Sequence, residues 1–180
     1  NLKIMFKNLL SNWVLWYDKT DLNICKDNWD QFLIKIHSIN SIDNFWRLFN
    51  NLVPLIETPI GSNYHFFKEG IEPKWEDLEN IGGGKWVLTY PKKNLEVEKI
   101  WEKTLLTLIS EKFSLMGKQY INGLVANIRK NEVRFSIWTK NSTDKNVQLR
   151  IGKFWKKIIE EELGKKTLLF EYFSHSTCLR

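Results

Sequence analysis

The sequence has little of what makes a membrane, disulfide-stapled or multidomain protein. It contains two cysteines in 180 residues, too few and too far apart for a disulfide framework. No stretch of about 20 residues is free of charge, which argues against a membrane-spanning helix. Because no Pro-rich linker, internal repeat or long charge run divides the chain, we expect one domain over residues 1–180. The few cysteines and the lack of a signal-like N-terminus predict a cytoplasmic location, with the nucleus as an additional possibility.

Catalytic and metal-binding patterns are missing as well. The three histidines are scattered, and no HExxH, CxxC or nucleophile-elbow motif occurs. His175 and Cys178 are three residues apart, but no second ligand pair lies nearby, so a zinc site is not expected. We therefore expect a binding protein that is not an enzyme and uses no cofactor or metal.

Positive charge and tryptophan are both in excess. The 27 Lys and Arg residues against 21 Asp and Glu give a formal net charge of +6, which favours an anionic partner without identifying one. The nine tryptophans are more than the core of one small domain needs. Four of them lie in predicted strands or on apolar helix stripes and are assigned to the core: Trp13, Trp86, Trp101 and Trp155.

Hydrophobic periodicity predicts more strands than helices. Strand patterns occur at 12–17, 32–37, 85–90, 124–129, 133–139 and 167–173. Helical patterns occur from 41 to about 52, at 95–113 and at 144–163. Hairpins mixed with single helices predict an α+β fold, a mainly antiparallel sheet with helices on one face. The other face is then left to solvent or ligand.

The predicted hairpin at 124–139 carries a functional pattern. Residues two apart in a strand share a face, so Arg134 and Trp138 point away from the core while Phe135 points into it. If Arg129 and Arg134 form a cross-strand pair beside the turn, their like charges repel. A bound anion would relieve that repulsion. A solvated basic hairpin tip is the alternative, and these residues taken alone favour it.

A polar loop at 70–77 contains a second candidate. Trp75 lies two residues after Pro73 and next to Glu76 and Asp77. It is suited to stack on a flat ligand while a carboxylate accepts hydrogen bonds from the ligand edge. Packing of Trp75 against the rim of the sheet fits the composition equally well. Trp29 lies in another polar loop and is a similar candidate.

A small apolar patch is predicted on the helices. Ile42 and Trp46 lie one turn apart at the edge of the first helix's apolar stripe, and Leu106 lies opposite the stripe of the second. Such a patch could dock a partner helix. Isolated exposed apolar residues are also common, so the residues alone leave this open.

These motifs together resemble the eukaryotic translation initiation factor 4E family, whose members bind the 5′ cap of messenger RNA. The matching segments follow the family's order and spacing over nearly the whole chain: LLSNWVLWY at 9–17, DNFWRLFN at 43–50, FKEGIEPKWED at 67–77, GGKW at 83–86, and residues 101–109 and 127–139. The FKEGIEPKWED stretch is highly specific. The resemblance implies a curved antiparallel sheet backed by three long helices on its convex face.

The resemblance also implies a binding site for the 7-methylguanine base. Trp29 and Trp75 would hold the base between them, and Glu76 would accept hydrogen bonds from its N1–H and amino groups. Trp138 would approach the N7 methyl group. Because methylation gives the ring a positive charge, the two indoles would add cation–π attraction to stacking.

The same resemblance implies that basic residues bind the triphosphate of the cap. Arg129 and Arg134 would hold it, with Lys85 in support. This supplies the anion that the hairpin pattern suggested. The expected ligand is therefore capped messenger RNA, bound by a protein that we expect to be a monomer.

The resemblance places a partner surface on the convex side. It would receive the scaffold factor 4G or a 4E-binding protein through Ile42, Trp46, Leu106, Leu9 and Lys103. The chain departs from the family here, because Glu102-Lys103 stands where a Leu-Glu pair is usual. A base in place of an acid predicts a partner motif with altered charges, or weaker binding.

Three functions are compatible with these observations. The first is an initiation factor that binds the cap and bridges to a scaffold. The second is a cap-binding repressor that does not recruit the usual scaffold, which the Glu102-Lys103 exchange favours. The third, from a different class, is a Trp-rich nucleotide- or carbohydrate-binding module, which would require the family motifs to be disregarded.

Overall fold

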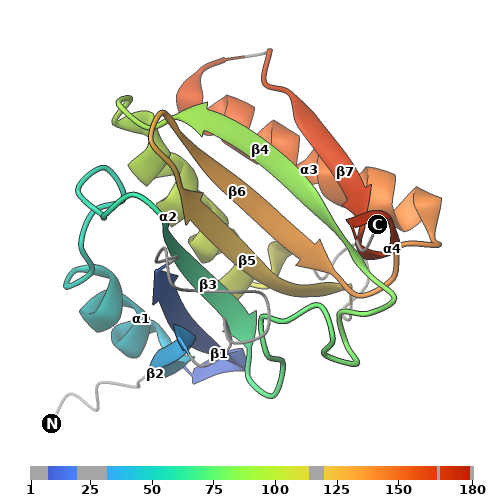
Figure 1. The fold of residues 1–180 in the computed structure, drawn as a ribbon, viewed down its shortest axis with the longest axis horizontal. Helices are drawn as coiled ribbons and strands as arrows, with labels where there is room; N and C mark the ends of the chain where they lie inside the picture. The colour runs from blue at the N-terminus through green and yellow to red at the C-terminus, as the bar shows by residue number, and fades with distance from the viewer. Residues whose placement is uncertain (1–7, 20–31, 114–119, 166, 179–180) are drawn as a thin grey trace, which may run out of the picture.

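A curved seven-stranded antiparallel sheet organises the molecule, with α1, α2 and α3 on one of its faces (Figure 1). The computed structural model describes residues 8–19, 32–113, 120–165 and 167–178. The strand order is β2-β1-β3-β5-β6-β4-β7, and every neighbouring pair is antiparallel. The α+β prediction is confirmed.

The elements follow one another as β1, β2, α1, β3, β4, α2, β5, β6, α3, β7 and α4. The strands are β1 (Asn8–Lys19), β2 (Ile34–Ser41), β3 (Ser62–Lys68), β4 (Gly84–Pro91), β5 (Ile121–Ile128), β6 (Glu132–Thr139) and β7 (Phe170–Ser174). The helices are α1 (Ile42–Phe49), α2 (Glu96–Ile109), α3 (Lys145–Leu163) and α4 (His175–Cys178).

Two of these elements have no counterpart in the sequence patterns. Strand β3 lies near the middle of the sheet and is buried on both faces over Ser62–Phe67. Polar and apolar residues alternate only over Asn63–Phe66, and the adjacent Phe66 and Phe67 end the alternation. The period of two is therefore too short to stand out in the sequence. Helix α4 is a single four-residue turn after β7.

The helix boundaries follow local hydrogen bonding. Ser41 caps α1 as predicted, because its hydroxyl accepts from the Asn44 N–H at 3.2 Å. Helix α1 ends at Phe49, before the predicted position 52, and the Asn51 side chain donates to the carbonyl of Arg47 at 2.7 Å. Gly164 closes α3 in the left-handed conformation at φ +64°, the C-terminal cap that the sequence predicts.

The main core lies between the helices and the sheet face that they cover. Trp13, Trp101 and Trp155 are buried in it, as predicted. Trp86 lies half-buried at the margin, where its indole N–H donates to the carbonyl of Gln148 at 3.1 Å. Among the residues described, no helix combines the length and apolar character that a membrane crossing needs.

Strand β2 corrects one expectation. The alternation of Phe32, Ile34 and Ile36 predicts a strand with one apolar face, but these side chains are 41%, 58% and 41% exposed. Strand β2 is at the edge of the sheet and, among the described strands, pairs only with β1. The pairing also shifts register between Leu15 and Trp16. An edge strand has neighbours on one side only, so its apolar residues lack a surface to pack on.

Candidate functional site

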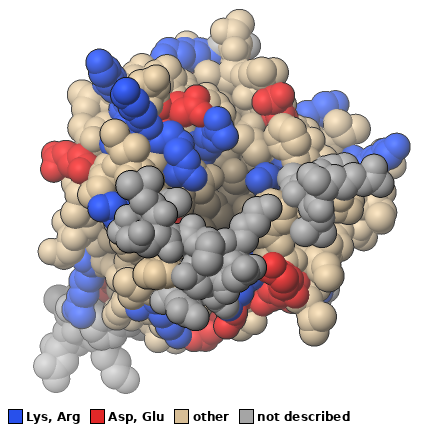
Figure 2. Space-filling view, viewed as in Figure 1, with Lys and Arg blue, Asp and Glu red and all other residues tan. Residues whose placement is uncertain are grey.

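The sheet face away from α1, α2 and α3 carries the predicted site residues. This face is turned toward the viewer in Figures 1 and 2, and Figure 2 shows a hollow on it with Lys and Arg side chains along its border. A second, smaller apolar cluster lies here, separate from the main core. It consists of buried Phe67, Val125 and Trp138, with Ile71 and Trp75 packed against it.

The β5–β6 hairpin has the two faces that its sequence predicts. Val133, Phe135 and Ile137 are fully buried in the main core. Arg134 and Trp138 lie on the opposite face. Trp138 is buried, because Phe67 packs edge-on against its ring at a centroid distance of 5.5 Å. The hairpin therefore presents an indole and a cation about 13 Å apart along one strand.

The two arginines are diagonal neighbours, which corrects the predicted cross-strand pair. Arg134 lies opposite Asn127, whereas the Arg129 N–H donates to the Glu132 carbonyl at 2.9 Å and closes the turn. They are still close enough to interact. Burial, and after it the Arg134 charge, lowers the pKa of Arg129, against a smaller opposing effect of Asp18 and Glu132.

Arg134 has a carboxylate neighbour that the sequence reasoning missed. Its Nε donates to Glu132 Oε1 at 2.6 Å, and Nη2 lies 2.6 Å from the same oxygen. The Arg134 side chain is 55% exposed, and such surface ion pairs contribute little stability because water competes for both partners. A phosphate could therefore replace Glu132 as the acceptor.

The loop between β3 and β4 holds Trp75 and Glu76 on a hydrogen-bonded frame. Asp77 accepts from the backbone N–H groups of Glu72 and Glu79, each at 2.9 Å. The buried Asn80 side chain donates to the carbonyls of Glu72 at 2.9 Å and Lys74 at 2.8 Å. Since both sides of Trp75 and Glu76 are tied down, this frame fixes the position of their backbone.

The frame is anchored to the sheet through β5. Asn122 donates to Asn80 Oδ1 at 2.9 Å and to the Glu79 carbonyl at 2.6 Å. Asn80 and Asn122 are buried, so these bonds are shielded from water. With the Asp77 carboxylate engaged inside the loop, Glu76 is left exposed. Of the two neighbouring acids, Glu76 is therefore free to accept hydrogen bonds from a ligand and Asp77 is not. The sequence alone did not distinguish them.

Trp75 is half-buried and has both an aromatic and a cationic neighbour. Its ring is nearly parallel to the His175 imidazole, at 18° and a centroid distance of 6.2 Å. Lys85 Nζ lies over the Trp75 ring, 5.5 Å from its centroid. Lys85 is in turn directly opposite Trp138 in the β4–β6 pairing. The structure thus brings Trp75, Lys85 and Trp138 together, and Trp75 also packs on the sheet as the alternative reading proposed.

His175 is a site residue that the sequence did not identify. It is buried, and its ring lies 4.4 Å from that of Trp138. Nδ1 donates to the carbonyl of Asn80 at 2.8 Å, whereas Nε2 is buried and has no hydrogen-bond partner within the described part of the chain. Burial lowers the pKa of His175; the Lys85 charge adds to this and the Asn80 bond opposes it. The imidazole is therefore kept neutral beside two indoles.

Trp29, the second predicted stacking residue, lies outside the described residues. The other predicted members of the site are on the face away from the three covering helices, or at its rim. No group of three His, Cys, Asp or Glu side chains within the described ranges could hold a metal ion.

The predicted partner residues lie on the helix side of the molecule. The four apolar ones are partly buried against the main core: Leu9, Ile42, Trp46 and Leu106. Leu106 is thus not an isolated exposed side chain. Lys103 forms an ion pair with Glu162 of α3, with 2.8 Å between Nζ and Oε2.

Comparisons with known proteins agree with this architecture. A family model described as Eukaryotic initiation factor 4E matches residues 8–180. The Candida albicans protein named eukaryotic translation initiation factor 4E is 36% identical over 170 residues, which cover 93% of this chain and 78% of that protein. A Capsicum annuum isoform 4E is 35% identical over 150 residues, covering 83% and 73%.

Two solved structures share the fold closely. The crystal structure of Ascaris suum eIF4E-3 in complex with an m2,2,7G cap superimposes with a TM-score of 0.86 at 33% identity, covering 95% of this chain and 92% of that one. C. elegans eIF4E-3, in complex with the 4E-binding protein Mextli and a cap analogue, gives a TM-score of 0.87 at 31% identity, covering 97% and 95%.

Proposed function

The chain belongs to the eukaryotic initiation factor 4E family, and we propose that it binds the 7-methylguanosine 5′ cap of messenger RNA in translation initiation. It is a binding factor and not an enzyme, as the family is. The cap complex of the similar Ascaris suum protein supports this assignment. We further propose that residues 1–180 form one cap-binding domain, that it is monomeric, and that it works in the cytoplasm, where messenger RNA is translated.

The base is recognised at the rim formed by the loop between β3 and β4. Trp75 stacks on one face of the methylated guanine, and Trp29 is proposed for the other. Lys85 over the Trp75 ring supports this role, because it shows that a face of the ring is open to a cation, which the charged base would replace there. The neutral state of His175 also suits a positively charged base, since an imidazolium beside it would repel that charge.

Guanine identity is read by Glu76. Its carboxylate accepts from the N1–H and amino groups, and adenine lacks the matching donors. The hydrogen-bonded frame made by Asp77 and Asn80 supports this role because it holds the backbone of Glu76 without using the Glu76 side chain. Trp138 lies on the N7 side of the base, in the small apolar cluster with Trp75.

The phosphates extend from the base along β6 toward the hairpin turn. Lys85 of β4 lies opposite Trp138 of β6. Arg134 is also in β6, four residues from Trp138 and nearer the hairpin turn. The rise of a strand gives about 13 Å between these positions, a span that suits a ribose and its phosphates. Arg129 and Arg134 bind the phosphates at the turn, where Glu132 gives up its contact with Arg134.

One observation carries the proposal. A framed loop with Trp75 and Glu76, an indole from β6 and three cations lie in sequence along one sheet face. Base, ribose and phosphates require these groups in the same order.

The direct test is a tryptophan-fluorescence titration with 7-methyl-GTP and with GTP. Cation–π contacts contribute about 1–2 kcal/mol on each face of the charged base. We therefore expect 7-methyl-GTP to quench the fluorescence and to bind at least about 30-fold more tightly than GTP. Equal affinities for the two nucleotides would overturn the proposal.

Replacement of Glu76 tests how the guanine edge is read. Glu76→Ala removes hydrogen bonds to a charged acceptor, so the affinity for 7-methyl-GTP should fall roughly 10- to 100-fold. Glu72→Ala is the matched control, because Glu72 is an exposed acid of the same loop with no assigned ligand contact. If Glu76→Ala bound as tightly as this control, another group would have to recognise guanine.

The helix side is proposed as the docking surface for a scaffold factor of the 4G type or for a 4E-binding protein. The C. elegans complex with Mextli supports a partner of this kind, and Leu9, Ile42, Trp46, Leu106 and Lys103 are the proposed contacts. The Glu102-Lys103 exchange supports a second candidate function, a cap-binding repressor, because a partner must meet a base here where the resemblance implies an acid. Retention of a scaffold-derived helical peptide on immobilised protein would distinguish the initiator from the repressor.

A further inference from the structure

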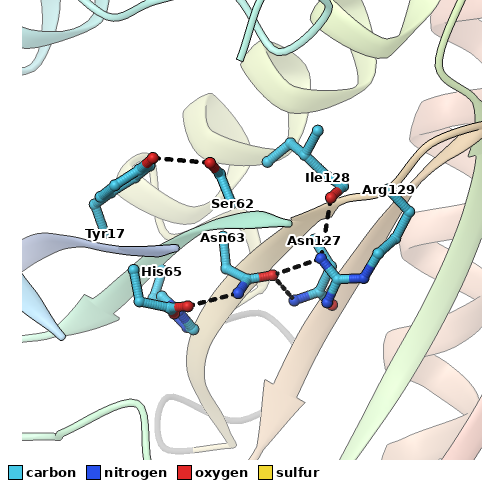
Figure 3. Close-up of polar contacts among 8 residues, drawn as sticks. Tyr17, Ser62, Asn63, His65, Asn127, Ile128 and Arg129 are labelled. Atoms are coloured by element: carbon cyan, nitrogen blue, oxygen red, sulfur yellow. Dashed lines mark hydrogen bonds and ion pairs between the residues drawn. The ribbon is translucent and has the colours of Figure 1, made fainter. Parts of the chain in front are cut away.

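A row of polar side chains next to Arg129 crosses the sheet face (Figure 3). Asp18 of β1 lies directly opposite Asn63 of β3, and Asn63 lies directly opposite Asn127 of β5. Asp18 and Asn63 are 7% and 6% exposed. Buried polar side chains on a sheet are costly unless their hydrogen bonds are satisfied. Each side chain in this row must therefore turn its donors toward acceptors, which restricts its orientation.

The hydrogen bonds run continuously from Asp18 to Arg129. Asn63 Nδ2 donates to Asp18 Oδ1 at 2.7 Å, and the second carboxylate oxygen lies 2.5 Å from His65 Nε2. On its other side, Asn63 Oδ1 accepts from Asn127 Nδ2 at 2.8 Å and from Arg129 Nη1 at 3.0 Å. Figure 3 shows Asn127 and Arg129 converging on the side-chain oxygen of Asn63.

The carboxylate of Asp18 decides which way the Asn63 amide points. A carboxylate has acceptors only, so Asn63 must turn its N–H₂ group toward Asp18. Its oxygen is then fixed on the side of Arg129. Without Asp18, only the donors of Asn127 and Arg129 would hold the amide in this orientation, and nothing on its other side would oppose a turn.

Arg129 is held by one nitrogen and leaves an edge of its guanidinium available. Nη1 donates both to Asn63 Oδ1 and to the carbonyl of its neighbour Ile128, each at 3.0 Å. Among the described residues, Nε and Nη2 have no hydrogen-bond acceptor. These two nitrogens form the edge of a guanidinium that can bind two oxygens of one phosphate at once.

We propose that Asp18 is a positioning residue for phosphate binding, acting through Asn63 to fix Arg129 with its Nε–Nη2 edge toward a phosphate of the ligand. This inference rests on the proposed function, in which Arg129 binds the triphosphate. Asp18 itself does not touch the ligand. Burial and the Arg134 charge lower the pKa of Arg129, and the Asp18 charge opposes them.

The test compares a ligand that has phosphates with one that has none. The quantity to measure is the ratio of the affinity for 7-methyl-GTP to that for 7-methylguanosine. Asp18→Ala should lower this ratio roughly 10-fold while leaving the 7-methylguanosine affinity unchanged, because only the phosphate contact depends on Arg129. Glu161→Ala, which removes the same charge from an exposed position of α3, should leave both affinities unchanged.

Two further variants exclude a merely structural explanation. Asp18→Asn keeps the size of the side chain and, because an amide has both donors and acceptors, should still lower the ratio at least about threefold. In the Asp18→Ala background, Asn63→Asp places a carboxylate oxygen where Asn63 Oδ1 now accepts from Arg129, whichever way the group turns. This double variant should restore the ratio to within about twofold of the wild type.

The possible outcomes separate this inference from the proposed function. If Asp18→Ala and Asp18→Asn both leave the ratio unchanged, or weaken both ligands equally, Asp18 does not position Arg129. Failure of Asn63→Asp to restore the ratio would also overturn the inference. If the wild type did not prefer 7-methyl-GTP to GTP, the proposed function would fail instead. Should Asp18→Ala not fold, as judged by circular dichroism, Asp18→Asn decides by the same ratio.

Discussion

At the scale of single residues, the site depends on groups whose chemical state is set by burial. His175 is 2% exposed and lies beside Trp75 and Trp138. The charge of Lys85 lowers the pKa of His175 further and so disfavours its protonation. The folded structure therefore favours the neutral imidazole, because a protonated one would be buried without water around it.

This arrangement predicts a dependence of stability on pH. The folded pKa of His175 is lowered, so below the ordinary value of about 6.5 the unfolded chain binds a proton that the folded chain resists. The contribution of His175 to stability is complete above about pH 6.5 and is lost as the pH falls through the folded pKa. Thermal unfolding of the wild type should therefore occur at a lower temperature at pH 5.5 than at pH 7.5.

The matched variants identify the group responsible. His175→Gln, which cannot titrate, should show a smaller decrease in melting temperature between these two pH values. His37→Gln changes an exposed histidine of β2 and should retain the wild-type decrease. Equal decreases in the wild type and His175→Gln would assign the effect to other groups.

At the scale of elements, the packing of α3 against β4 depends on a glycine. A Cβ added to Gly152 would lie 2.5 Å from Cζ2 of the Trp86 ring, inside the contact distance. The indole has little freedom to move away, because its N–H bonds to Gln148 and its ring packs on Tyr172 at 5.2 Å. Helix and sheet thus approach more closely here than any other residue would permit.

Gly152→Ala should therefore destabilise the protein although alanine is the better helix former. Helix propensity favours alanine by about 1 kcal/mol, but forced overpacking costs about 1–3 kcal/mol. We expect a net loss of up to about 2 kcal/mol in the free energy of unfolding, measured in urea. Lys153→Ala, at the exposed next position, should change it by less than about 0.5 kcal/mol. A Gly152→Ala variant more stable than the wild type would show that the ring moves aside.

At the scale of the whole molecule, the main core joins elements from both ends of the chain. It includes Trp13 of β1, Ile100 of α2, Phe135 of β6 and Trp155 of α3. The sheet is continuous from β2 to β7, so the N-terminal and C-terminal halves of the chain share one sheet. A shared core and a shared sheet make independent unfolding of either half unfavourable.

We therefore expect a single cooperative unfolding transition. Tryptophan fluorescence and far-ultraviolet circular dichroism should give coincident curves in urea, because both report the loss of one structure. Two separated transitions, or curves that do not coincide, would contradict the proposal that residues 1–180 form one domain.

The sequence determined most of the elements and the two faces of the β5–β6 hairpin. Periodicity and caps identified α1, α2 and α3 and the two faces of the β5–β6 hairpin, because these features depend on residues a few positions apart. The FKEGIEPKWED motif located Trp75 and Glu76 by resemblance. Strand β3 escaped detection because its alternation of polar and apolar residues spans only Asn63–Phe66 and ends at the Phe66-Phe67 pair.

Only the tertiary structure decided which of these residues act together. His175 meets Asn80 across 95 positions of the chain, and Asn63 meets Asp18 across 45. Cross-strand register sets such contacts, and a shift of one residue would turn every side chain to the other face. The position of β2 at the sheet edge also leaves its apolar residues Ile34 and Ile36 exposed. Composition and spacing are local properties, whereas burial, the pKa of His175 and the direction of the Asn63 amide depend on neighbours that the fold supplies.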